Sequence, residues 1–290
     1  MNLHPLTLKS KPLVDDFLRR FPPVISEFTF TNLHAWRQSR PVWYREFAGS
    51  LLFFVRTANG PVLFGNPLGP VDLPAVLAAF AQKIRGVEHF PRAALPKSAL
   101  AGVAISADRD NADYVYRTTD LAELPGRDFT KKRNHINQCL STHDCRYETI
   151  TPQIIEECLD MQNRWCAARD CALEPGLSGE DLAVTEILRR YGDFGLMGGC
   201  IRINGVIEAF TVGEALNPST AVCHCEKAMP GYHGLAQLIN QWFAANELSN
   251  FAFVNREQDL GIPGLRKAKE SYHPVHLVEK VRLTLLTSPH

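Results

Sequence analysis

Short apolar runs alternate with amphipathic stretches along the chain, a pattern typical of a mixed α/β protein. In the first half, the spacing predicts helices over residues 13–21, 73–84 and 128–140, a hairpin over 42–55 and a strand over 113–117. Pro22-Pro23 ends the first helix, and Asp72 precedes the second as a capping residue. These elements form a less complete set of the elements expected in the second half of the chain.

The second half of the chain has a fuller set of elements. The pattern predicts strands over 146–150, 195–203, 206–213, 220–225, 251–254 and 276–285, and helices over 152–169, 179–191, 234–247 and 264–270. The order is strand, two helices, three strands, helix, strand, helix, strand, which is that of the acyl-CoA N-acyltransferase (Gcn5-related) fold. A chain of 290 residues suits two domains. We predict an α/β (α+β) fold with two such domains in tandem, residues 1–145 and 146–290, each a mixed sheet flanked by helices.

Polar residues gather directly after the apolar run Phe251–Val254, which is short enough to be a strand buried on both faces. Residues 255–261 hold charges and amides, and a basic helix follows over 264–270. In open α/β sheets, ligands bind beyond the carboxyl ends of the strands. The segment 255–274 is therefore either a site or a solvated loop followed by a helix with a charged outer face.

Charge and targeting signals narrow the range of partners. Lysine plus arginine equals aspartate plus glutamate at 31 each, so no global field attracts DNA, and any polyanion must bind a local patch. No apolar run approaches the roughly 20 residues that span a bilayer. The amino terminus lacks a secretory signal. We expect a cytoplasmic protein without a transmembrane segment.

All eight cysteines lie between residues 139 and 225. Without a secretory signal, reduced thiols are expected rather than disulfides. Cys223, His224, Cys225 and Glu226 are residue types that bind metals, but alternate side chains of a strand point to opposite faces. No CxxC pair completes a set of four ligands, so no metal is expected.

Three motifs resemble one known family. They are Asp120-Leu121 and Leu124-Pro125-Gly126 with Lys131-Lys132-Arg133-Asn134-His135-Ile136-Asn137; Glu226-Lys227-Ala228; and Asn255–Gly261 with Gly264–Lys269, Tyr272 and Pro274. Along nearly its whole length, the chain is similar to the soluble family related to the carboxy-terminal domain of phosphatidylglycerol lysyltransferase. The resemblance implies two acyltransferase-fold domains packed side by side. It also implies kinship with aminoacyl-tRNA-dependent transferases, including the peptidoglycan-bridge enzymes.

In the lysyltransferase, an aminoacyl ester on tRNA is passed to a lipid headgroup. The membrane-spanning half of that enzyme has no counterpart in this sequence, which leaves the acceptor open.

Three carboxylates are candidates for catalysis. Glu226 ends one predicted strand, and Glu257 and Asp259 follow the next, so they can lie close together if the strands are neighbours. Acyl transfer requires a polarised donor carbonyl, a nucleophile that loses its proton and a grip on the donor's anionic part. One carboxylate can serve as the general base or bind an acceptor ammonium. The alternative is that each pairs with a neighbouring basic residue.

Basic and polar residues are candidates for holding the substrate. Arg266 and Lys269 share a helix face because they are three positions apart, while Lys267 points elsewhere. The basic helix of the first half is a second phosphate-binding candidate, or simply an exposed basic face. The candidate substrate-binding residues are Asn255, Arg256, Arg266, Lys269, Tyr272, Lys132, Arg133 and Asn137.

The loop over residues 230–236 stands where this fold binds the pyrophosphate of coenzyme A at a helix amino terminus. The usual signature begins with Gln or Arg, then has Gly three residues later and Gly or Ala two beyond that. Gly234 and Ala236 fit, but Gly231 occupies the first place. This partial match weakens acyl-CoA as the donor and leaves aminoacyl-tRNA open.

We therefore expect an acyltransferase that uses aminoacyl-tRNA as the donor and an amine or hydroxyl of a small molecule as the acceptor, with its cleft between the two domains. An acyl-CoA-dependent N-acyltransferase is the nearest alternative. The third is a catalytically degenerate protein that binds a small anionic or amino-acid-like ligand. No motif encodes the acceptor, the acyl group or the oligomeric state.

Overall fold

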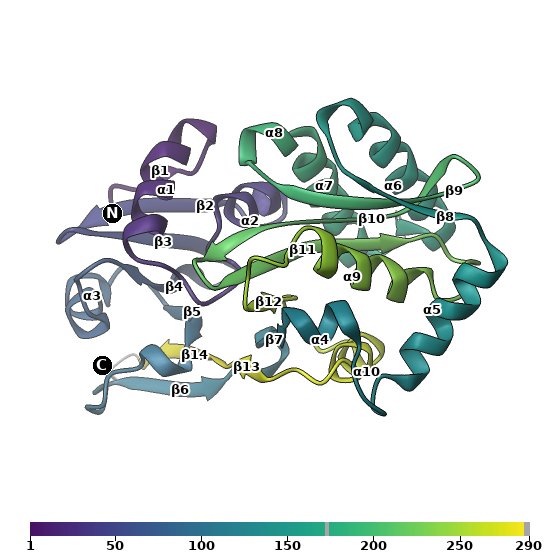
Figure 1. Cartoon of the computed structure of the whole chain (residues 1–290). Helices are drawn as coiled ribbons and strands as arrows, with labels where there is room; N and C mark the ends of the chain where they lie inside the picture. Colours follow the sequence, from purple (N-terminus) through teal and green to yellow (C-terminus); the bar gives the residue numbers. More distant parts are fainter. Residues whose placement is uncertain (172–173, 287–290) are drawn as a thin grey trace. The chain divides into compact units, whose positions relative to one another are not determined.

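The computed structural model describes residues 1–171 and 174–286 of the chain (Figure 1). The chain forms two compact units, each built from separate stretches of sequence. Unit 1 comprises Met1–Tyr114, Glu257–Lys267 and His276–His290, and unit 2 comprises Val115–Arg256 and Ala268–Val275. Each unit has a central sheet of mixed strand direction with helices packed on it, which confirms the predicted fold class.

The sheet of unit 1 has the strand order β1, β2, β3, β4, β5, β14, β6. Neighbouring strands are antiparallel except β4 and β5, which are parallel. The strands are β1 (His4–Pro5), β2 (Val42–Phe47), β3 (Ser50–Thr57), β4 (Gly60–Leu68), β5 (Gly86–Pro91), β6 (Val103–Ala107) and β14 (Lys280–Leu285). The helices are α1 (Lys11–Arg20), α2 (Phe30–Ala35) and α3 (Leu73–Phe80), and the short strand β13 (His276–Val278) also belongs to this unit.

Helix α3 shows how the sequence determines packing in unit 1. The Asp72 carboxylate accepts a hydrogen bond from the Ala75 amide at 2.9 Å, which caps the helix as predicted. The buried face of α3 packs in one apolar cluster with sheet residues that include Leu52 and Phe54. The helix ends at Phe80 rather than at residue 84, because the Lys83 amide bonds to the Phe80 carbonyl in a tighter turn.

The strands of unit 2 follow the order β7, β12, β11, β10, β9, β8. Strands β11 and β12 are parallel, and the other neighbours are antiparallel. The strands are β7 (Asp113–Arg117), β8 (Cys145–Thr149), β9 (Met197–Ile203), β10 (Val206–Asn217), β11 (Thr220–Ala228) and β12 (Phe253–Asn255). The helices are α4 (Thr118–Glu123), α5 (Thr130–Thr142), α6 (Ile155–Arg169), α7 (Pro175–Arg189), α8 (Tyr191–Phe194) and α9 (Leu235–Asn246), and α10 (Pro263–Glu270) ends in this unit.

Helices cover both faces of the unit 2 sheet. Figure 1 shows α6 and α7 on one side and α9 on the other, with α4 and α5 packed against α9. From β8 to α10, the elements follow the predicted acyltransferase order, with the short α8 added before β9. Among the helices formed by the described residues, none is both long and apolar enough to cross a membrane.

The compact units divide the chain differently from the predicted boundary at residue 145. Residues 115–117 of β7 pair with β12, so the chain from Val115 onward belongs with the second sheet. Strand β14 pairs with both β5 and β6, so the end of the chain returns to the first sheet. Both pairings join residues far apart in sequence, which local hydrophobic patterns do not encode.

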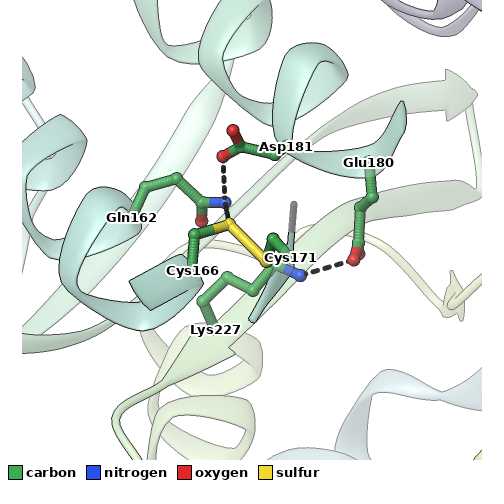
Figure 2. The surroundings of a disulfide bond; sticks show 6 residues. All are labelled: Gln162, Cys166, Cys171, Glu180, Asp181 and Lys227. Carbon is green, nitrogen blue, oxygen red and sulfur yellow. Dashed lines mark hydrogen bonds and ion pairs between the residues drawn. A yellow bond between two sulfur atoms is a disulfide. The ribbon is translucent and has the colours of Figure 1, made fainter. Parts of the chain in front are cut away.

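A disulfide joins Cys166, near the end of α6, to Cys171, in contrast to the expectation of reduced thiols (Figure 2). The two residues are five apart, and their Cα atoms lie 5.1 Å from each other, within the usual range for a disulfide. Beside it, Gln162 donates a hydrogen bond to Asp181, and Lys227 pairs with Glu180 at 2.8 Å (Figure 2). The bond therefore fixes the chain just after α6.

Candidate functional site

A polar cluster lies at the carboxyl ends of β11 and β12 in unit 2. We call it the Arg256 cluster, and it consists of Arg256, Glu226, Asn240, Tyr116 and Tyr272. Arg256 donates from Nη2 to Glu226 Oε1 at 3.1 Å, and Asn240 donates from Nδ2 to Glu226 Oε2 at 2.8 Å. The guanidinium lies 4.8 Å from the ring centroid of Tyr272 and 5.6 Å from that of Tyr116. The cluster thus holds one ion pair between aromatic rings.

Strand lengths determine this arrangement. Asn255, the last residue of β12, pairs with Val222, while β11 continues to Ala228. Arg256 therefore leaves the sheet beside the extended end of β11, which carries Glu226. Asn240 reaches the same carboxylate from the buried face of α9.

Burial and ion pairing shift the pKa of Arg256 in opposite directions. Burial lowers the pKa of its guanidinium, but the Glu226 carboxylate and the two tyrosines more than offset this, so the pKa lies above its ordinary value. Arg256 Nη1 and Asn240 Oδ1 are both buried and have no hydrogen-bond partner among the residues that the structure describes. The cluster therefore presents one unused donor and one unused acceptor, each of which costs about 1–3 kcal/mol when left unpaired.

Two lysines adjoin the Arg256 cluster. Lys132 on α5 lies 3.8 Å from the Tyr272 ring centroid, and its Nζ is 2.6 Å from Ser271 Oγ. Burial and the positive charges of Arg256 and Lys131 lower the pKa of Lys132 to about 8. Lys269 donates to the Arg256 carbonyl. Of the residues predicted from sequence, unit 2 thus gathers Glu226, Arg256, Lys269, Tyr272 and Lys132 in one place.

Glu257 belongs to unit 1 and makes different contacts. Its Oε1 accepts a hydrogen bond from Asn32 Nδ2 at 2.8 Å. Its backbone has φ of 57°, a left-handed conformation that is uncommon for a residue other than glycine. The next residue, Gln258, donates to Ser26, Glu27 and Asp113. Glu257 therefore begins a tightly held turn.

Asp259 has no exposed surface and lies in a network that satisfies both carboxylate oxygens. It accepts hydrogen bonds from Arg109, Tyr114, Arg266 and the Gly261 amide at 2.6–2.9 Å. Burial raises the pKa of this carboxyl, but the hydrogen bonds more than offset that, so the pKa lies below its usual range. Asp259 therefore stabilises the turn over residues 257–266 through its hydrogen bonds to Gly261 and Arg266.

Replacing Asp259 with asparagine is expected to destabilise unit 1 by about 3 kcal/mol, since the partly exposed Arg266 and Arg109 side chains lose the buried carboxylate that they share. The matched control is Asp110→Asn, because Asp110 contacts the same Arg266 guanidinium at 2.7 Å but is 61% exposed. The control is expected to change the free energy of unfolding by less than about 1 kcal/mol. Urea unfolding of both variants checks this, and equal losses would refute the structural role.

The other predicted substrate-binding residues are buried, exposed or bonded to other protein groups. Asn255 is fully buried at the end of β12. Arg133 donates to the Leu124 and Gly126 carbonyls, the latter at 2.7 Å, and so holds the turn before α5. Asn137 is exposed on α5. Arg266 and Lys269, expected to face one ligand together, bind Asp259 and the Arg256 carbonyl respectively.

The predicted donor loop precedes α9. Gly234 has φ of 86°, and a Cβ there would lie 2.0 Å from the His135 carbonyl oxygen, so only glycine fits against α5. Gly231 has φ of 104° and open space around it, and Ala236 is exposed in the first turn of α9. The loop thus brings its backbone close to α5, and its role in binding a donor stays a prediction.

Sequence reasoning missed several residues around the Arg256 cluster. Asn240 follows Leu238 and Ile239 on a helix and has no local signal of a role. Tyr116 lies in an apolar strand and resembles a core residue, and Ser271 resembles a turn residue. Among the described residues, no group of three or more His, Cys, Asp or Glu side chains is placed to hold a metal ion.

The element order of unit 2 is that of an acyltransferase-like fold. Residues 18–283 match the family described as "Phosphatidylglycerol lysyltransferase, C-terminal", and the chain belongs to that family. The family predicted from the sequence motifs is confirmed. A search of curated proteins finds no match.

Three solved structures are similar to this chain. A conserved protein of unknown function from Bacteroides thetaiotaomicron is 33% identical, with a TM-score of 0.88 over 98% of this chain and 99% of that one. The C-terminal domain of a putative lysylphosphatidylglycerol synthetase from Agrobacterium fabrum is 14% identical, with a TM-score of 0.67 over 96% and 91%. L-PGS from Bacillus licheniformis is 12% identical, with a TM-score of 0.66 over 96% and 92%. The last two show likeness of fold alone.

Proposed function

We propose that this protein transfers an aminoacyl group from an ester donor to an amine or hydroxyl acceptor, and that the Arg256 cluster holds the reacting group. The observation that carries the proposal is the pair of buried, unpartnered atoms, Arg256 Nη1 and Asn240 Oδ1. A ligand with both an acceptor and a donor removes two desolvation costs at once. An aminoacyl ester has both, in its carbonyl oxygen and its ammonium group.

Arg256 has the chemistry to polarise the acyl carbonyl. Its Nη1 donates toward the oxygen on which negative charge develops as the carbonyl is attacked, and its side chain is already fixed by Glu226 and two rings. Such preorganised donors lower the barrier without reorganisation at the moment of reaction.

Glu226 and Asn240 have the chemistry to bind the ammonium group. A carboxylate has about four lone-pair sites, and the contacts with Arg256 and Asn240 occupy one on each oxygen of Glu226. Asn240 Oδ1 supplies a further acceptor. A simple acetyl group has no ammonium to use these acceptors, so the cluster favours an aminoacyl donor. The name of the family, a lysyltransferase, agrees with this choice.

An acyl-CoA-dependent N-acyltransferase is the second candidate. The observation in its favour is the loop of Gly231, Gly234 and Ala236 before α9, whose backbone comes near a helix amino terminus. The incomplete signature of this loop makes it the weaker candidate.

The test follows label from charged tRNA into product. The donors are tRNAs charged with labelled lysine and then with other amino acids, and the acceptors are phosphatidylglycerol vesicles and pooled small amines. We expect the label to leave the tRNA and to appear in one class of acceptor only when the protein is present. Glu226→Gln should slow it by about 10–100-fold, the value of a charge-assisted hydrogen bond. The control Glu208→Gln changes a similar pair, with Arg164 at 2.9 Å, and should leave the rate unchanged. Consumption of acetyl-CoA with charged tRNA untouched would overturn the proposal.

A further inference from the structure

Ser271 and Lys132 form a hydroxyl–amine pair that the roles above do not use. Ser271 follows the end of α10 and is exposed, and Lys132 lies on α5. Lys132 Nζ and Ser271 Oγ are 2.6 Å apart, a short hydrogen bond. All atoms of this pair belong to unit 2, as does the Arg256 cluster.

The pair is next to the site already described. Lys132 Nζ lies 3.8 Å from the ring centroid of Tyr272, and the Arg256 guanidinium lies 4.8 Å from that same centroid. Tyr272 is also the residue that follows Ser271. The serine–lysine pair and Arg256 thus share Tyr272 as a neighbour, and the charge of Arg256 acts on Lys132.

The lysine is suited to accept a proton. A lysine acts as a base only when its amine is neutral, and an ordinary lysine is charged at neutral pH. Burial, Arg256 and Lys131 lower the pKa of Lys132 to about 8, so a substantial fraction is neutral near pH 8. Tyr272 and Ser271 also face this amine.

We propose that Ser271 is a nucleophile and Lys132 its general base, so that the acyl group passes through an ester on Ser271 before it reaches the acceptor. This proposal rests on the proposed function and extends it. Serine–lysine pairs are one of the known arrangements that activate a hydroxyl for acyl transfer.

The first half of the reaction forms the acyl-enzyme. The hydroxyl of Ser271 turns from the Ala268 carbonyl, to which it now donates at 2.6 Å, toward neutral Lys132. Ser271 Oγ attacks the donor carbonyl, and Lys132 takes the hydroxyl proton. The bond to the donor oxygen breaks, and that oxygen leaves with the proton from Lys132.

The second half of the reaction releases the acyl group. The acceptor amine or hydroxyl attacks the Ser271 ester and gives a proton to Lys132. Lys132 returns the proton to Ser271 Oγ as the ester bond breaks. The two halves restore the protein, and no reagent other than donor and acceptor is consumed.

The test uses p-nitrophenyl acetate as an activated ester, followed by intact-mass and peptide mass measurements. We expect one acetyl group on Ser271 of the full chain, removed by neutral hydroxylamine as an ester is. Ser271→Ala should lose this label, and Lys132→Met should slow labelling by about 100-fold or more. Thermal unfolding of both variants shows that they are folded.

The matched control is Ser141→Ala. Ser141 is an exposed serine on α5 that donates to the carbonyl three residues earlier, as Ser271 does, but no lysine of the described residues hydrogen-bonds to it. The control should label as the wild type does. A hydroxylamine-resistant label on Lys132, or equal labelling of Ser271→Ala and wild type, would overturn the proposal.

The charged-tRNA assay separates this proposal from the function on which it rests. If Ser271→Ala transfers label from charged tRNA at the wild-type rate, transfer is direct, and the nucleophile proposal falls while the proposed function stands. If Ser271 is acetylated but the wild type uses no charged tRNA, the proposed donor is wrong and the serine–lysine pair stands.

Discussion

Replacing Arg256 with alanine is expected to lower the rate of aminoacyl transfer by about 100–1,000-fold, the usual effect of removing one preorganised donor to a developing oxyanion. The reason is that Arg256 Nη1 is the buried donor without a partner in the Arg256 cluster, and Glu226 fixes its position. Single-turnover transfer from charged tRNA measures this loss. The fall should appear in the maximal rate, because the interaction strengthens as the carbonyl is attacked.

Arg164→Ala is the matched control for Arg256→Ala. Arg164 also pairs with a glutamate of unit 2, Glu208, at 2.9 Å, and it donates to the Ile207 carbonyl. Its loss should leave the transfer rate within about twofold of wild type after correction for stability. Because Arg256→Ala leaves the Glu226 carboxylate without its cationic partner, the double variant Arg256→Ala, Glu226→Gln tests whether stability alone explains the loss. Wild-type transfer by a folded Arg256→Ala protein would contradict the assigned role.

The second large effect concerns stability. Lys280→Met is expected to lower the free energy of unfolding by about 3–5 kcal/mol, since it breaks a fully buried ion pair and leaves uncompensated charges. Lys280 Nζ lies 2.7 Å from Glu27 Oε2 and 2.7 Å from Asp113 Oδ1, and all three side chains are at most 4% exposed. The control Lys11→Met breaks a part-exposed pair with Asp15 and should change stability by less than about 1 kcal/mol. Urea unfolding measures both.

The ion pair between Lys280 and Glu27 also makes the stability of the fold depend on pH. Burial raises the pKa of Glu27, but Lys280 and His89 more than offset it, so the folded-state pKa lies well below the ordinary value. A carboxyl with a depressed folded pKa stabilises the fold above its unfolded pKa, about 4.3, and this is lost as the pH falls. Wild type should therefore lose stability below about pH 4, and Lys280→Met should lose less over the same range. Parallel losses would contradict the assignment.

The sequence carries enough information for most of the local structure. The Asn204-Gly205 pair predicts the tight turn between β9 and β10, and both residues adopt positive φ there. The strand expected over 276–285 is broken at Glu279 into β13 and β14. The return of β14 to the first sheet was not predicted, because strand pairing over nearly two hundred positions leaves no periodic signal.

At the site, too, the local residues could be predicted from the sequence, whereas the long-range contacts could not. Glu226 and Arg256 were predicted because each follows an apolar strand, and their ion pair depends only on the parallel neighbours β11 and β12. Asn240 and Tyr116 contribute through packing of α9 and β7 against those strands, and neither stands out from its helix or strand. Asp259 has the residue type of a catalytic acid, but its contacts with two arginines and a tyrosine are visible only in three dimensions.

The most direct test of the central claim compares binding of two donors to wild type and Arg256→Ala. The probes are tRNA bearing a stable amide-linked aminoacyl group and acetyl-CoA. We predict saturable binding of the aminoacylated tRNA that exceeds the binding of uncharged tRNA, with this excess removed by Arg256→Ala. Saturable binding of acetyl-CoA, with none of aminoacylated tRNA, would contradict an aminoacyl donor at the Arg256 cluster.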